Sequence, residues 1–163
     1  GFGRIGSRLG KAAKSLGFRV VFNDVLDIQE KHGCEQVHLQ NLLAESDVIT
    51  IHVDGRKENN HLCNTTMFRA MKSTVIFMNA SRGFVVDDYA LTDFLMHNTT
   101  AYAILDVHDP EPITSECPLL HVPNATLYPH VACKTKTAMA NMGWVVKDIE
   151  AALSGKEPQC KVC

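Results

Sequence analysis

Three polar residues of this sequence have side chains that can bind the carboxylate of a small organic acid and transfer a proton to an oxygen beside it. Arg82, Glu111 and His130 each come shortly after a short apolar run. An arginine guanidinium can bind a carboxylate through two parallel hydrogen bonds. A histidine titrates near neutral pH and can pass a proton to an oxygen, while a neighbouring glutamate orients the imidazole and favours its protonated form. These residue types predict a site that holds a carboxylate and moves a proton close to it.

A glycine-rich loop opens the chain and predicts a second kind of site. Residues 1–6 read G-F-G-R-I-G, and Asp24 stands 18 positions after Gly6. In such a loop Gly1 permits a tight turn, Gly3 lets a pyrophosphate approach the backbone, and Gly6 lets the next helix pack closely. An acidic residue about 20 positions on can bind the ribose hydroxyls and repel a 2′-phosphate, which favours NAD over NADP. With a nicotinamide bound beside the polar trio, hydride transfer on a 2-hydroxy or 2-keto acid becomes possible.

The elements that must position these residues alternate between helical and strand patterns. Apolar spacing predicts helices over 4–16, around 39–43, over 64–71 with Asn64 or Thr65 as N-cap, over 88–97 with Asp87 as N-cap, and over 134–153. Apolar, largely β-branched runs predict strands over 18–23, 47–52, 74–79, 101–106 and 125–128, with a possible short one at 34–37. A proline-rich loop spans 107–123. The alternation indicates a doubly wound parallel α/β sheet, with helices on both faces and strands buried between them.

The carboxyl ends of the predicted strands gather the candidate residues at one edge. Ligands of open α/β sheets bind at this edge, where Asp106 ends a strand and Arg82 and His130 follow theirs. The glycine-loop fingerprint needs a strand before Gly1, and the sequence begins without one. We therefore expect a sheet that lacks its first strand because the upstream part of a longer chain is not included.

Composition narrows the choice of partners. The chain has 163 residues, with 16 Lys and Arg against 18 Asp and Glu, so its formal net charge is −2. This predicts essentially one domain, and no basic excess favours nucleic acid or an anionic membrane. No apolar run approaches the ~20 residues of a membrane helix, and no signal peptide is recognisable. The six cysteines are irregularly spaced, and we interpret the pair Cys160 and Cys163 as chance spacing rather than a metal or redox site. Free thiols indicate a reducing, cytoplasmic location.

Several motifs in the same order resemble the NAD-binding domain of the D-isomer-specific 2-hydroxyacid dehydrogenases, a family that includes phosphoglycerate dehydrogenase. The resemblance covers essentially the whole chain. The motifs are Gly1–Gly6, Asp24, Ser46–Val53, Met71-Lys72, Asn79–Asp87, Leu105–Val107 with Glu111-Pro112, and Pro123-Asn124 through Pro129-His130. The resemblance implies a Rossmann-type three-layer αβα domain over 1–153 and a tail, 154–163, that leads back to a substrate domain.

The resemblance also implies a role for each candidate residue. Arg82 would bind the substrate carboxylate, His130 would be the acid/base, and Glu111 would be its partner. The residues implied to meet the cofactor NAD are Gly1, Gly3, Arg4, Ile5, Gly6, Asp24, Val53, Ala80, Arg82, Asp106 and His130. The implied partner is a small 2-hydroxy or 2-keto acid, no metal is expected, and the full-length protein would be a homodimer.

Two departures and two alternatives accompany this resemblance. Asp54 stands where the family usually has a proline beside the cofactor cleft, and His108 and Asp109 are interpreted as loop variation rather than a metal site. The first alternative function is an NADH-responsive corepressor, which would keep the same polar trio and bind peptide motifs. The second, a formate-type dehydrogenase, is disfavoured because that group has Gln where Glu111 stands.

Overall fold

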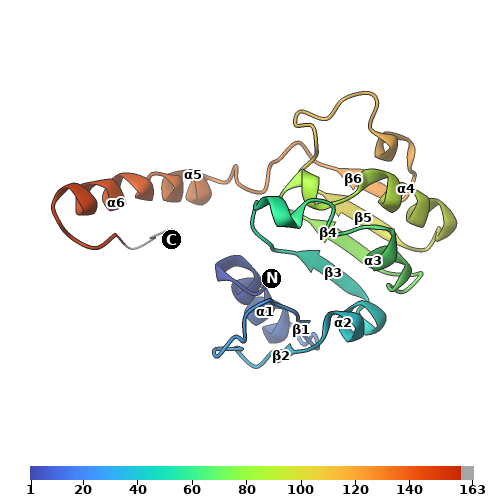
Figure 1. The fold of residues 1–163 in the computed structure, drawn as a ribbon, viewed down its shortest axis with the longest axis horizontal. Coiled ribbons are helices and arrows are strands. Elements are labelled where there is room, and N and C mark those ends of the chain that lie inside the picture. The colour runs from blue at the N-terminus through green and yellow to red at the C-terminus, as the bar shows by residue number, and fades with distance from the viewer. Residues whose placement is uncertain (159–163) are drawn as a thin grey trace. The chain divides into compact units, whose positions relative to one another are not determined.

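The computed structural model describes residues 1–158 and divides them into two units, Gly1–Pro129 and a second that begins at His130 (Figure 1). The predicted Cys160–Cys163 pair lies outside the described residues. The strands of the first unit are β1 (Val21–Phe22), β2 (Glu35–Gln36), β3 (Val48–Ile51), β4 (Ile76–Asn79), β5 (Tyr102–Leu105) and β6 (Ala125–Leu127). Its α-helices are α1 (Arg4–Ser15), α2 (Leu39–Glu45), α3 (Thr65–Arg69) and α4 (Asp88–His97). Its 3-10 turns are η1 (Lys57–Asn59), η2 (Gly83–Val85) and η3 (Pro118–His121).

The larger sheet is parallel and has the strand order β3-β4-β5-β6. Helices α3 and α4 pack on one of its faces through aromatic contacts. The ring of Phe68 on α3 meets Phe77 of β4 edge to face, with centroids 5.2 Å apart, and stacks on Phe94 of α4 at 5.7 Å. Since Phe68 and Phe77 are almost fully buried, this aromatic layer fixes the two helices to the strands.

The smaller sheet pairs β1 with β2 in parallel, and α1 packs against it. The rings of Phe2 and Phe22 stack with centroids 3.7 Å apart, and Cys34 completes the small core. A side-chain carbon on Gly10 of α1 would lie 2.9 Å from the ring of Phe2, so the absence of a side chain there allows α1 to approach.

The predicted α/β class, a Rossmann-type fold with parallel strands and flanking helices, is confirmed, although the strands form two sheets and the larger one is not fully covered on both faces. Burial alternates along β3, β4 and β5, so that one face of these strands is buried and the other is partly open. Val48, Ile76 and Tyr102 on the open face are 44, 39 and 38% exposed. The reason is that α3 and α4 pack on the opposite face, while α1 packs on the smaller sheet instead.

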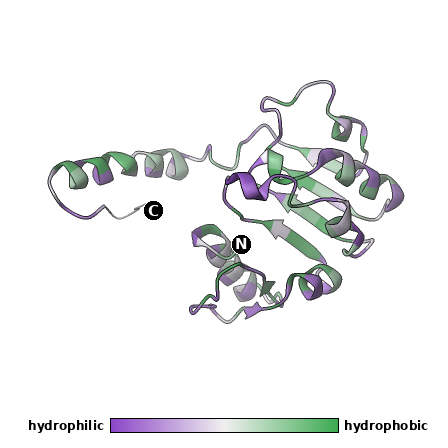
Figure 2. Cartoon of the chain, in the orientation of Figure 1, coloured by the Kyte–Doolittle hydropathy of each residue, from purple (hydrophilic) through white to green (hydrophobic). Residues whose placement is uncertain are grey.

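The predicted helix 134–153 is wrong as a single element. The second unit holds two helices, α5 (Lys136–Met142) and α6 (Trp144–Leu153), which meet at Gly143. Glycine in a helix interior costs about 1 kcal/mol relative to alanine, and here the Gly143 N–H bonds three residues back, to Ala140. Apolar side chains of the two helices are more than half exposed and colour them partly green in Figure 2: Met139, Met142, Val145, Val146, Ile149 and Leu153.

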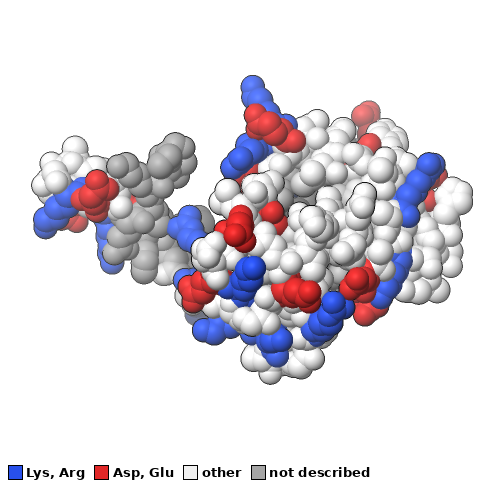
Figure 3. Space-filling model, turned by 60° about the horizontal axis from the view of Figure 1, so that its bottom comes forward, with Lys and Arg blue, Asp and Glu red and all other residues white. Residues whose placement is uncertain are grey.

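The other predicted elements are confirmed, with shorter strands. Both predicted N-caps form: the Asn64 side chain accepts from the Met67 N–H, and the Asp87 side chain accepts from Tyr89 and Ala90. The possible strand at 34–37 exists as β2. Positive and negative side chains are interspersed on the face shown in Figure 3. Within residues 1–158, every helix is too short or too polar to cross a membrane.

Candidate functional site

The glycine loop is set between the ends of β1 and β3. A side-chain carbon on Gly1 would lie 2.5 Å from the carbonyl oxygen of His52, and one on Gly6 would lie 2.4 Å from the carbonyl oxygen of Gly1. Neither position has room for a side chain. A carbon on Gly3 would have no atom within 4 Å, so the loop is open at the residue that precedes α1. The loop therefore presents bare backbone and a helix N-terminus to that open space, which fits a pyrophosphate.

Asp24 closes the other side of this loop. Its Oδ2 accepts a hydrogen bond from the Phe2 N–H at 2.6 Å, and its Oδ1 accepts from the Leu26 N–H at 3.0 Å. Desolvation raises the pKa of the Asp24 carboxyl, but the backbone donors outweigh it and the net shift is downward. Asp24 thus stays ionised and fixes the loop to the end of β1.

The turn that carries Arg82 is built around Asn79. The Asn79 side chain is 1% exposed; its Nδ2 donates to the carbonyl oxygen of Arg82 at 2.8 Å, and its Oδ1 accepts from the Ser81 N–H and hydroxyl at 2.9 and 2.7 Å. The Arg82 Nη1 also donates to the Ser81 carbonyl at 2.7 Å. A single buried amide therefore sets the backbone from which the exposed guanidinium projects.

The loops after β4 and β5 interlock beside Arg82. A side-chain carbon on Gly83 would lie 1.9 Å from the backbone of His108, so only glycine fits there. The Asp106 N–H donates to the Asn79 carbonyl at 2.9 Å, which places Asp106, 8% exposed, next to the Arg82 turn. His108 is buried, and its Nε2 lies 2.8 Å from the carbonyl oxygen of Tyr128. Within residues 1–158, no group of three or more potential metal ligands forms.

For the remaining predicted residues, the structure gives a position on the backbone. Val53 and Ala80 lie on the loops directly after β3 and β4, at the same edge as the glycine loop, and Glu111 is exposed on the loop after β5. His130 is the first residue of the second unit and has a left-handed backbone, with φ of +52°. The grouping of Arg82, Glu111 and His130 therefore stays a prediction.

Two supporting residues were not predicted as part of the site. Asn79 and His52 occur within recognised motifs, but only the structure shows what they contact. His52 lies under the glycine loop, with its Nε2 3.0 Å from the Thr50 hydroxyl, and burial lowers its pKa. The sequence signal that could have found both residues is that each is polar and stands at the end of an apolar run that forms a strand.

The fold and the glycine loop define an α/β dinucleotide-binding domain, and comparison with known proteins gives its family. Residues 1–132 match the model of the D-isomer specific 2-hydroxyacid dehydrogenase, NAD binding domain. The chain belongs to this family, and its cofactor is NAD.

Similar proteins include dehydrogenases and reductases of the same family. A glyoxylate reductase from Korarchaeum cryptofilum is 38% identical over 97% of this chain and 49% of its own length. A D-3-phosphoglycerate dehydrogenase from Archaeoglobus fulgidus is 37% identical over 91% of this chain and 29% of its own length. A glyoxylate reductase structure from Paecilomyes thermophila has a TM-score of 0.90 at 27% identity, over 99% of this chain and 50% of that one. The chain thus spans about half the length, or less, of the relatives it matches.

Proposed function

We propose that this chain is the cofactor domain of an NAD-dependent enzyme that interconverts a D-2-hydroxy acid and its 2-keto acid. The observation that carries the proposal is the edge formed by the carboxyl ends of β1, β3, β4 and β5. There the Asp24 carboxylate binds the backbone of the glycine loop, Gly1 of that loop lies against the backbone of His52, and the Asp106 N–H donates to Asn79 beside the Arg82 turn. The names of the similar proteins support the proposal, because they are names of dehydrogenases and reductases.

The cofactor would lie along this edge from the glycine loop to Asp106. The open backbone at Gly3, together with the start of α1 at Arg4 and Ile5, would bind the pyrophosphate. Asp24, already held in its ionised form, would accept hydrogen bonds from the adenosine ribose and disfavour a 2′-phosphate. Further along, Val53 and Ala80 would line the cleft and Asp106 would bind the carboxamide.

The chemistry would be shared among three side chains. When bound, NAD would accept a hydride during oxidation of the hydroxy acid, and its reduced form would donate a hydride during reduction of the keto acid. Arg82 would bind the substrate carboxylate through its guanidinium, which orients the neighbouring carbon. His130 would give a proton to the carbonyl oxygen during reduction and take it back during oxidation, and Glu111 would hold the imidazole in its protonated form.

The full-length protein would contain a second domain beside this one. Residues 1–153 would form the cofactor domain, and 154–163 would lead into a substrate domain that shuts water from the cleft. Relatives about twice as long as this chain support a second domain. The apolar exposed residues of α5 and α6, such as Val146 and Leu153, are suited to contacts with that domain or with a second copy in a homodimer. We propose a cytoplasmic location.

The corepressor alternative gains no support from the similar proteins named above. It nevertheless predicts a different outcome in the decisive experiment, which uses the full-length protein and follows NADH absorbance with hydroxypyruvate, glyoxylate, pyruvate and phosphohydroxypyruvate. Turnover of one acid is expected, with kcat/KM reduced about 10³-fold in Arg82→Ala because a charge-assisted bidentate contact is lost. NADH binding without turnover of any of these acids would reject the dehydrogenase and favour the corepressor.

A further inference from the structure

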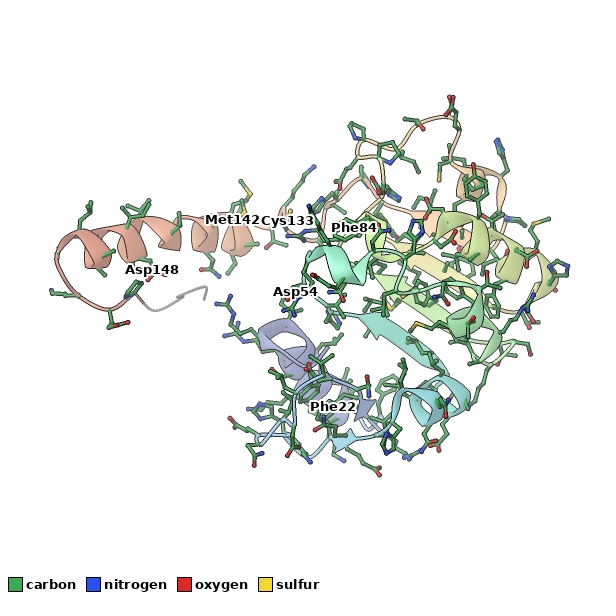
Figure 4. All side chains as sticks on the ribbon, in the orientation of Figure 1. Phe22, Asp54, Phe84, Cys133, Met142 and Asp148 are labelled. Atoms are coloured by element: carbon green, nitrogen blue, oxygen red, sulfur yellow. The ribbon has the colours of Figure 1, made fainter. Side chains whose placement is uncertain are left out.

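The loop between β3 and η1 contains an ion pair between Asp54 and Arg56. The Arg56 Nε donates to both carboxylate oxygens of Asp54, at 2.8 and 3.0 Å, and Arg56 Nη2 donates to Oδ2. Asn59 Nδ2 donates to the carbonyl oxygen and to Oδ1 of Asp54, each at 3.0 Å. Figure 4 shows Asp54 on this loop, at the end of the sheet where the site lies. The carboxylate of Asp54 therefore ties residues 54, 56 and 59 together.

This loop contacts both halves of the site. At its start, the backbone of His52 and Val53 lies against Gly1 of the glycine loop. One residue after Asp54, a side-chain carbon on Gly55 would lie 3.4 Å from Cγ and 3.5 Å from Nε of Arg82. The loop thus connects the pyrophosphate end of the proposed cleft to the side chain proposed to bind the substrate.

The exposure of the Asp54–Arg56 ion pair indicates that it acts on the conformation of its own loop rather than on global stability. Both side chains are more than half exposed, and exposed ion pairs add little to global stability. Hydrogen bonds from Arg56 lower the pKa of the Asp54 carboxyl, which keeps it charged at neutral pH. Gly55 has no side chain to limit its own conformations, so the two residues that flank it must hold the loop in place.

We infer that Asp54 is a positioning residue: by binding Arg56 and Asn59, it holds Gly55 against the side chain of Arg82. The inference rests on the proposed function, because it assigns Asp54 a role in orienting the substrate-binding guanidinium. Asp54 does not touch the reacting atoms. Its loss frees the loop and lets Arg82 sample positions away from the substrate carboxylate.

The first test compares Asp54→Ala with wild type in the full-length protein, using whichever 2-keto acid is turned over. KM for the acid should rise about tenfold while kcat changes by less than about threefold, because a misplaced guanidinium weakens substrate binding. Arg56→Ala should give a similar rise, and the double variant should be no worse than either single variant, because both remove the same interaction. Asp54→Asn retains an acceptor oxygen and should restore part of the loss.

A matched control comes from α4. Asp93 Oδ1 lies 3.3 Å from His97 Nδ1 on an exposed helix surface, so Asp93→Ala removes an exposed carboxylate contact outside the site and should leave KM unchanged. A KM for Asp54→Ala within about twofold of wild type would overturn the inference.

Hydrogen–deuterium exchange gives a readout that does not depend on turnover. Asp54→Ala should speed exchange in peptides covering 53–60 and 80–84, whereas Asp93→Ala should not. If the wild-type protein turns over no 2-keto acid, the proposed function fails, and exchange alone then decides the positioning role. Unchanged exchange at 53–60 and 80–84 would reject it.

Discussion

The two sheets of the first unit have cores of very different size, although each holds part of the site. Three buried apolar residues form the core under α1, β1 and β2: Phe2, Phe22 and Cys34. The core of the four-stranded sheet has 21 buried apolar residues, drawn from the strands, from α2, α3 and α4 and from the loops. The smaller region bears the glycine loop and Asp24, and the larger one bears Arg82 and Asp106.

This difference indicates how each half of the site is held. Arg82 and Asp106 are fixed to strands inside an extensive core, so packing determines their backbone. The glycine loop depends on a few directed contacts, chiefly the bond from Phe2 to Asp24 and the close approach of Gly1 to His52. Regions with few buried apolar contacts open at lower free energy than the rest of a protein. We therefore expect the region that bears the glycine loop and Asp24 to open more readily than the region that bears Arg82 and Asp106.

The largest expected effect is on stability. Phe77→Ala should lower the free energy of unfolding by about 4 kcal/mol, because Phe77 is fully buried and the cavity cannot collapse around it. Phe22→Ala should cost about half as much, since the small cluster can close over the gap. Urea unfolding followed by circular dichroism measures both. Val25→Ala, at a residue 94% exposed, should have no measurable effect. Equal losses at Phe22 and Phe77 would contradict the comparison.

Thiol reactivity should separate the two regions next. Burial raises the pKa of Cys63 in the larger core to about 12, and burial also raises the pKa of Cys34 in the smaller one. Both thiols must wait for local opening before they react, so Cys34 should be alkylated by iodoacetamide at least about tenfold faster than Cys63. Mass spectrometry of peptides over time gives both rates, and alkylation in urea gives the unprotected reference. Similar protection of both thiols would argue against easier opening of the smaller region.

The smallest expected effects are on the pH dependence of the free energy of unfolding. Asp24, in the smaller region, and Asp88, in the larger one, should act on it with opposite signs. Because the pKa of Asp24 is lowered in the folded state, its contribution is present above the ordinary value of 3.8 and is lost as pH falls through the folded value. Asp88, on α4, has its pKa raised by desolvation, although the bond from Cys117 opposes the shift. Its contribution is present below 3.8 and is lost as pH rises through the folded value.

Unfolding free energies of Asp24→Asn and Asp88→Asn, measured from pH 3 to pH 7, test these signs. Removing Asp24 should flatten the rise in stability with increasing pH, and removing Asp88 should steepen it. Both effects should be smaller than either phenylalanine effect, because solvent screens these partly exposed carboxyls. If both substitutions changed the slope of stability against pH in the same direction, the pKa values of Asp24 and Asp88 would not be shifted in opposite directions.

Sequence reasoning predicted most of the fold because its signals are local. The helix that begins at Arg4, the caps at Asn64 and Asp87 and the parallel strands all follow from spacing and side-chain type. The break at Gly143 was missed because apolar spacing continues across it. The three 3-10 turns were missed because such short elements carry no periodic signal.

The site was predicted as a set of residues, but its supports were not. Strand ends indicated where Asp24, Arg82 and Asp106 would lie. The role of Asn79 depends on which backbone atoms its amide reaches, and the ties between Asp54 and Asn59 depend on how the loop folds. Such bonds join residues whose spacing has no repeating pattern, so only the three-dimensional structure shows them.

Strand β3 lies at the edge of its sheet, and among residues 1–158 its outer side has no partner strand. Its backbone N–H and C=O groups on that side form a template to which a strand from another molecule can add. Val48, on the partly open face of this strand, adds apolar surface that a paired strand would help to bury. Concentrated stocks of this segment by itself are therefore expected to aggregate through intermolecular strand pairing, and purification would benefit from low protein concentration.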